Sequence, residues 1–130
     1  MRIWNFFTFG KEWPDKKLEI PADVVFLFPG TFAALNMNGV SEYTVAPDNP
    51  RYTAINGALF TKDLRTLVAF PPAKNGEYTV PTNVRHIAPY AFCQSRLDKL
   101  KIPKTIDSIS RKAFDRSPSL GWDRATIQYI

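Results

Sequence analysis

A short pattern occurs three times in this chain and limits what the chain can fold into. PTNVRHIAPYAF (residues 81–92) is followed by PKTIDSISRKAF (residues 103–114), and PADVVFLFPGTF (residues 21–32) has the same spacing. Pro opens each copy and Phe closes it, with Val or Ile at the fourth position. Self-similarity of this kind is the signature of a repeat protein whose units stack on one another. The sequence therefore predicts a solenoid.

An alternating pair of apolar residues precedes each proline and predicts a short strand. Proline lacks the N–H that a ladder needs, so it ends the strand. The apolar residues that follow, three apart, predict an irregular, 3₁₀-like or short helical return. The closing residues Phe32, Phe92 and Phe114 are expected to be equivalent and buried. The expected inward strand positions, including a further pair from SEYTV, are Leu18, Ile20, Tyr43, Val45, Tyr78, Val80, Leu100 and Ile102.

The residues between the inward positions are expected to face solvent. They are Lys17, Glu19, Glu42, Thr44, Glu77, Thr79, Lys99 and Lys101, joined by Gln128 if TIQYI forms a fifth strand. At ~4.8 Å between strands, five strands would make a face about 20 Å wide. Such a face suits one peptide, one loop or one glycan.

Residues 46–75 depart from the repeat and predict antiparallel strands. Asn56-Gly57 lies between RYTAI and ALF, which is a strong hairpin signal. TLVAF (residues 66–70) suggests a further strand, and two prolines then end it. We expect a small hairpin or meander insert on the edge of one coil.

The repeat and the insert together resemble the BspA-like, treponemal-type family of bacterial leucine-rich repeat proteins. The resemblance rests on the IPxxVxxIxxxAF pattern and on DNPRYTAINGALFTKDLRTLVAFPP, and it covers about residues 17–121. It implies a leucine-rich repeat solenoid of short parallel strands. It also implies a secreted or surface-displayed bacterial protein that takes part in adhesion by binding macromolecules.

The length of 130 residues fits a single leucine-rich repeat domain, residues 1–130. The open ends of such a stack need covering. We expect an aromatic cap at residues 1–16 (Trp4, Phe6, Phe7, Phe9 and Trp13) and a C-terminal cap strand at residues 120–130, with Trp122 and Tyr129. The N-terminal residues lack the pattern of a signal peptide, and no apolar run is long enough to span a membrane.

No residue pattern in the sequence indicates catalysis or a cofactor. The chain has one cysteine, Cys93, and one histidine, His86, too few for a structural metal site. A Cys93–His86 dyad is conceivable, but a small buried thiol and an exposed loop histidine are the simpler interpretation. No glycine-rich phosphate loop is present. We therefore expect no enzyme activity, no cofactor and no metal.

Residues 96–116 are unusually basic. Cations outnumber the carboxylates in this coil, where Arg96, Lys99, Lys101, Lys104, Arg111, Lys112 and Arg116 stand against Asp98, Asp107 and Asp115. The simplest interpretation is a solvated surface. The functional interpretation is a patch of Lys99, Lys101 and Lys104 that faces an acidic partner, with Glu77 and Thr79 on the neighbouring strand. Interleaved aromatic residues for base stacking are missing there.

These features favour a non-catalytic binding module for protein or glycan, of the cell-surface and adhesion type that the resemblance implies. An intracellular interaction or inhibitor protein is the alternative. Nucleic-acid binding through the basic coil is a third hypothesis, which predicts a steep salt dependence. We expect a monomer or weak oligomer that does not insert into membranes. Localisation stays open between extracellular or cell surface, by resemblance, and cytoplasmic.

Overall fold

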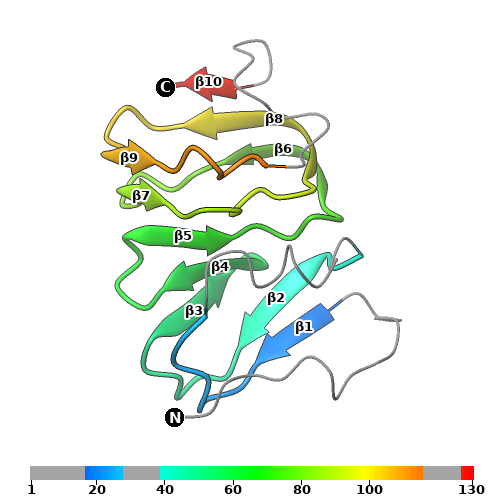
Figure 1. Ribbon diagram of the computed structural model, residues 1–130, viewed down its shortest axis with the longest axis vertical. Helices are drawn as coiled ribbons and strands as arrows, with labels where there is room; N and C mark the ends of the chain where they lie inside the picture. The colour runs from blue at the N-terminus through cyan, green and yellow to red at the C-terminus, as the bar shows by residue number, and fades with distance from the viewer. Residues whose placement is uncertain (1–16, 28–38, 116–126) are drawn as a thin grey trace.

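The computed structural model describes residues 17–27, 39–115 and 127–130, which form a mostly parallel β-solenoid (Figure 1). No helix occurs in these ranges. β1 and β2 lie at one end of the long axis and β10 at the other. The strands are β1 (Lys17–Ile20), β2 (Glu42–Val45), β3 (Tyr52–Ile55), β4 (Ala58–Thr61), β5 (Thr66–Ala69), β6 (Asn75–Thr79), β7 (His86–Ile87), β8 (Arg96–Ile102), β9 (Ser108–Ile109) and β10 (Ile127–Tyr129).

Two parallel ladders build the C-terminal coils. β6, β8 and β10 pair in one sheet, and β5, β7 and β9 pair in parallel in another. Each coil returns through turns and one two-residue strand. Its hydrogen bonds between backbone groups three residues apart are isolated, so they do not build a helix. One such bond joins Val84 N–H to the Pro81 carbonyl, and another joins Ile106 N–H to the Pro103 carbonyl. The return is thus irregular, as expected, and its helical alternative is wrong.

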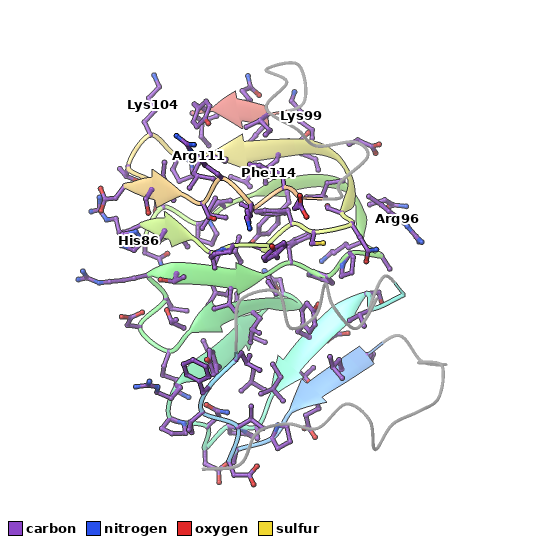
Figure 2. All side chains as sticks on the ribbon, viewed as in Figure 1. His86, Arg96, Lys99, Lys104, Arg111 and Phe114 are labelled. Carbon is purple, nitrogen blue, oxygen red and sulfur yellow. The ribbon has the colours of Figure 1, made fainter. Side chains whose placement is uncertain are left out.

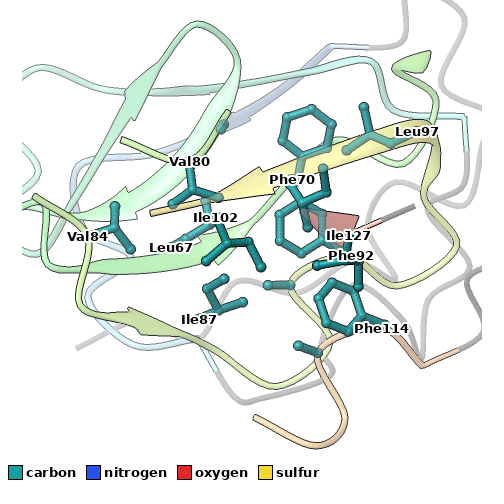
Figure 3. Close-up of a cluster of buried hydrophobic side chains, with 14 of the residues drawn as sticks. Leu67, Phe70, Val80, Val84, Ile87, Phe92, Leu97, Ile102, Phe114 and Ile127 are labelled. Carbon is teal, nitrogen blue, oxygen red and sulfur yellow. The ribbon is translucent and has the colours of Figure 1, made fainter. Parts of the chain in front are cut away.

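Phenylalanines stack through the core at the ends of the coils (Figure 3). The ring centroids of Phe92 and Phe114 lie 5.6 Å apart, and both side chains are buried. Their predicted equivalence is confirmed, whereas Phe32 lies outside the described residues. Phe70 continues the stack at 5.5 Å from Phe92, and its N–H bonds the Ala91 carbonyl as the Phe92 N–H bonds the Ala113 carbonyl. The sequence analysis missed this third member.

The insert is a three-stranded antiparallel meander formed by β3, β4 and β5. Asn56 and Gly57 both have positive φ, 51° and 84°, as expected of a tight hairpin turn. Both faces of the central strand β4 are buried. Ala58 and Phe60 belong to the C-terminal hydrophobic cluster, while Leu59 belongs to the cluster around β1 and β2. The predicted antiparallel meander is confirmed, but it separates two cores, so its expected place on the edge of one coil is wrong.

The meander also interrupts the strand surface that was expected to be continuous. β1 and β2 form a two-stranded sheet of their own, and no Cα of β2 lies within 8 Å of a Cα of β6. The hairpin tip lies between these strands, because the Gly57 carbonyl accepts the Tyr43 N–H at 2.9 Å and the Asn56 carbonyl accepts Lys74 Nζ at 3.2 Å. The prediction of one face of five adjacent strands is wrong.

Asn49 joins the meander to the first coil. Its buried side-chain amide donates to the carbonyls of Pro21 and Val24, at 2.8 and 2.9 Å. Its Oδ1 accepts the N–H groups of Arg51 and Tyr52. Four hydrogen bonds thus hold one side chain, which explains the Asn-Pro-x-Tyr segment of the sequence as a structural element.

Most of the predicted core is confirmed. Leu18, Ile20, Tyr43, Val80, Leu100 and Ile102 are buried, whereas Val45 and Tyr78 are half-buried. At the C-terminal end Ile127 is buried and Tyr129 is 47% exposed. Residues 1–16 and Trp122 of the expected caps lie outside the described residues. In the described ranges no helix is long and apolar enough to cross a membrane.

Candidate binding surface

The outward side of β6, β8 and β10 forms the strand face, which we define by Glu77, Thr79, Lys99, Lys101 and Gln128. Parallel pairing sets these residues side by side, with Glu77 opposite Lys99, and Lys101 between Thr79 and Gln128. Side chains alternate along a strand, so the buried Leu100 and Ile102 fix the lysines on the outer side. Four of the predicted site residues, together with the expected Gln128, are therefore neighbours.

An ion pair orders this surface. Lys101 Nζ lies 2.8 Å from Glu77 Oε1, across the two strands. The hydrogen bond from Lys101, with its charge and that of Lys99, lowers the pKa of the Glu77 carboxyl below its usual value. Solvent-exposed pairs of this kind contribute little to folding stability. The pair instead fixes where the charges stand relative to one another.

Lys104 does not belong to the strand face. It follows Pro103 in the turn beyond β8, where its backbone N–H donates to the Ile130 carbonyl and its side chain is exposed. Figure 2 shows Lys104 and Arg96 on opposite sides of the molecule, with Lys99 between them along β8. The basic residues that the structure describes in this coil are spread around its rim, Arg116 lies outside the described residues, and only Lys99 and Lys101 of the expected trio share a face.

A histidine–serine contact that the sequence analysis missed lies on the opposite ladder. His86 Nδ1 and Ser108 Oγ are 2.8 Å apart, because β7 and β9 pair in parallel with these residues opposite each other. Nucleophile–base pairs have this geometry. Both side chains are exposed, however, and among the interactions found within the described ranges no carboxylate orients the imidazole. The contact is thus best explained as a surface cross-strand hydrogen bond.

Cys93 is buried behind Phe92, as the sequence suggested. Burial, with the neighbouring Cys93, raises the pKa of the Tyr43 hydroxyl above its usual range. His86 is exposed on β7, while Cys93 is buried. Within the described ranges, no group of three His, Cys, Asp or Glu side chains could hold a metal ion.

A groove of about 840 Å³ lies between β2 and β6, where the meander separates the two sheets. Its charged lining residues are Glu42, Lys74 and Glu77, and its apolar ones include Val45, Ala54 and Tyr78. The groove adjoins the strand face, because Glu77 belongs to both. No sequence signal indicated it, since it depends on where the hairpin tip lies.

The stacked parallel strands, with Leu, Ile and Phe at repeated inward positions, define a leucine-rich-repeat-type solenoid. Among solved structures, the chain is similar to the pneumococcal vaccine antigen PcpA, with 28% identity and a TM-score of 0.71 over 80% of this chain. It is also similar in fold to a leucine-rich repeat protein from Eubacterium ventriosum, with 24% identity and a TM-score of 0.61 over 72% of this chain. The chain spans 26% and 32% of the lengths of these two proteins. No protein-family model matches the sequence, and no curated protein is similar to it.

Both similar structures are consistent with a repeat-type binding module. The fold of this chain provides rigid, parallel strands whose outer side chains stand at fixed spacings. Such a scaffold presents side chains to a partner without having to order them on binding.

Proposed function

We propose that this chain is a non-catalytic binding module that recognises a protein partner through the strand face. The observation that carries the proposal is the fixed array of Glu77, Lys99 and Lys101 on two paired strands. Strand pairing fixes the backbone positions of these residues and one ion pair joins Glu77 to Lys101, which reduces the conformational entropy lost on association. Three strands span about 10 Å, which suits a loop or a peptide.

The charges favour an acidic patch on a protein over the other partner classes. Lys99 and Lys101 stand among the polar groups of Glu77, Thr79 and Gln128, which gives a mixed pattern of donors and acceptors. A nucleic-acid strand would meet the Glu77 carboxylate beside the two lysines, on the neighbouring strand, which costs affinity. The strand face carries no aromatic side chain on which a sugar ring could stack, which favours a protein partner over a glycan.

The family resemblance adds a cellular setting to this proposal. As a BspA-like protein, the chain would act in adhesion at a bacterial cell surface, and similarity to a vaccine antigen supports that setting. An intracellular interaction or inhibitor protein is the alternative. The coding sequence upstream of this chain distinguishes the two, because a signal peptide there favours the surface and its absence the interior.

Charge reversal on the strand face and at Lys104, in the turn beyond β8, tests the proposal. Partners captured from bacterial and host lysates are identified, and their association kinetics are measured with Lys99→Glu/Lys101→Glu/Lys104→Glu. Rim charges act mainly through long-range attraction, so we expect slower association and a smaller change in dissociation. The difference between variant and wild type should shrink at ~1 M salt, where the Debye length falls to about 3 Å.

A matched variant, Arg51→Glu/Lys62→Glu/Arg65→Glu, makes the same change in net charge at exposed positions outside the basic coil and the strand face. It should alter association much less. Equal binding by both triple variants would show that the basic coil is only a solvated surface. A partner that turned out to be a nucleic acid, with a steep salt dependence, would also contradict the proposal.

A further inference from the structure

Among the described strands, none pairs with the groove side of β6. Val80 N–H donates to the Lys101 carbonyl of β8 at 2.9 Å. Backbone groups of alternate residues point to opposite sides of a strand, so the N–H and C=O of Glu77 and Thr79 point away from β8, toward the groove. Among the described strands, β6 pairs only with β8. An edge of this kind is a template for a further strand.

The groove beside this edge separates β2 from β6 by more than the spacing of two paired strands. Hydrogen-bonded strands lie ~4.8 Å apart, so a vacant strand position between two others requires a separation of about 9.6 Å. Every Cα of β2 lies more than 8 Å from every Cα of β6. At one end the hairpin tip of Asn56 and Gly57 closes the space, while Val45 of β2 and Glu77 and Tyr78 of β6 line it.

We propose that this groove binds an extended peptide segment that adds to β6 as a further strand and carries apolar and basic side chains alternately. Alternate side chains would point inward, toward Val45, Ala54 and Tyr78. The others would point outward between Glu42 and Glu77, the two carboxylates that line the groove, and would compete there with the present partners Lys17 and Lys101. A polypeptide fits, because its N–H and C=O groups repeat at the spacing of the β6 edge.

This inference rests on the proposed role in protein binding and names a second contact for it, beside the strand face. The two sites share Glu77 and differ in what they recognise. The strand face offers side-chain charges, whereas the edge of β6 offers backbone donors and acceptors. Their tests can therefore fail separately.

The probe is a fluorescein-labelled octapeptide of alternating valine and lysine, and the measurement is fluorescence anisotropy with the full chain. Two control peptides carry N-methyl groups, one on every valine amide and the other on every lysine amide. The amides of the two sets point to opposite sides of an extended peptide, so only one set faces β6. We expect one methylated peptide to lose binding by at least about tenfold, or ~1.4 kcal/mol, and the other to retain it.

A pair of protein variants tests the same edge. Thr79→Pro removes an N–H that is not used in the ladder with β8 and places a ring on the groove edge, so the fold should be kept. Tyr129→Pro makes the same backbone change at the outer edge of β10, away from the groove. We expect Thr79→Pro to weaken peptide binding at least about tenfold and Tyr129→Pro to leave it unchanged. Circular dichroism checks that both variants are folded.

Equal binding of both methylated peptides, or full binding by folded Thr79→Pro, would overturn the proposal. If Thr79→Pro does not fold, the two methylated peptides alone test the proposal. A wild-type chain that dimerises in sedimentation, with folded Thr79→Pro monomeric, would identify a second copy as the occupant and also overturn it. The variant Lys99→Glu/Lys101→Glu/Lys104→Glu should bind the peptide at least as tightly as the wild type, even if the strand face proves inactive.

Discussion

The two halves of the molecule bury their apolar side chains in different ways. In the C-terminal half, coils stack in register, and Phe70, Phe92 and Phe114 form one continuous column through their shared core. In the N-terminal half, β1 and β2 pack on the far face of the meander and form a separate hydrophobic cluster. A regular repeat buries each coil against an identical neighbour, whereas the meander needs a different partner for each of its faces.

The difference shows where specificity arises in this fold. Regular stacking produces a strand face whose residues follow directly from the repeat. The irregular junction between β2 and β6 produces the groove and an unpaired edge, which no single repeat contains. The four predictions below test whether the halves are independent in the way that their separate cores suggest.

Phe92→Ala should have the largest effect. The side chain is fully buried between two other rings, so its removal leaves a cavity and should cost roughly 3–5 kcal/mol of unfolding free energy. Chemical denaturation measures this, with Phe26→Ala as the exposed control. Hydrogen exchange should show the loss concentrated in β6 to β9. A cost below about 1 kcal/mol would contradict the column.

Asn49→Ala should affect the N-terminal half instead. It leaves two backbone N–H groups and two carbonyls without their partner, each worth about 1–3 kcal/mol if buried, and partial hydration should limit the total to ~2–4 kcal/mol. Hydrogen exchange should accelerate in β1, β2 and β3 more than in β6 and β8. Uniform acceleration across both halves would show that the two cores unfold as one.

Gly57→Ala tests the hairpin tip that separates the halves. Gly57 has a φ of +84°, and an added Cβ would lie 3.3 Å from Glu42 Cγ. The left-handed conformation alone costs an ordinary residue about 1–2 kcal/mol. Gly39→Ala is the matched control, since its Cβ would meet nothing within 4 Å. Thermal unfolding of the two variants should differ, and equal midpoints would mean that the tip is not constrained.

The smallest effect concerns Glu77 on the strand face. Its pKa lies below the ordinary 4.5 in the folded chain, so the stabilising contribution is complete above that pH and is lost as the pH falls through the folded pKa. NMR titration of the carboxyl should show this lowered pKa, and Lys101→Met should raise it. An unchanged Glu77 pKa in that variant would mean that the ion pair is absent in solution.

The sequence predicted what depends on the repeat itself. Leu100, Ile102, Phe92 and Phe114 follow from their spacing, and the tight turn follows from Asn56-Gly57, because local conformation determines both. Phe70 was missed since its repeat is compressed. Leu67 precedes Phe70 by three residues, whereas the equivalent Ile87 precedes Phe92 by five.

The rest depends on contacts between distant segments, which no local pattern encodes. The meander lies between two cores because the side chains on the two faces of β4 pack against two different hydrophobic clusters. The His86–Ser108 contact follows from the register of two-residue strands, and the separation of Lys104 from Lys99 and Lys101 follows from the turn after Pro103. The candidate site was therefore predicted as a set of outward residues, while its limits and the adjoining groove were not.

The stacking of coils around a buried Phe column also has a mechanical consequence. In the C-terminal coils the strands lie across the long axis of the molecule (Figure 1). A force along that axis would load the ladder bonds between coils one after another, so we expect these coils to peel apart individually at low force. The meander, held on both faces, would resist as a block. A chain under tension would thus lengthen from its regular end while its irregular centre stayed intact.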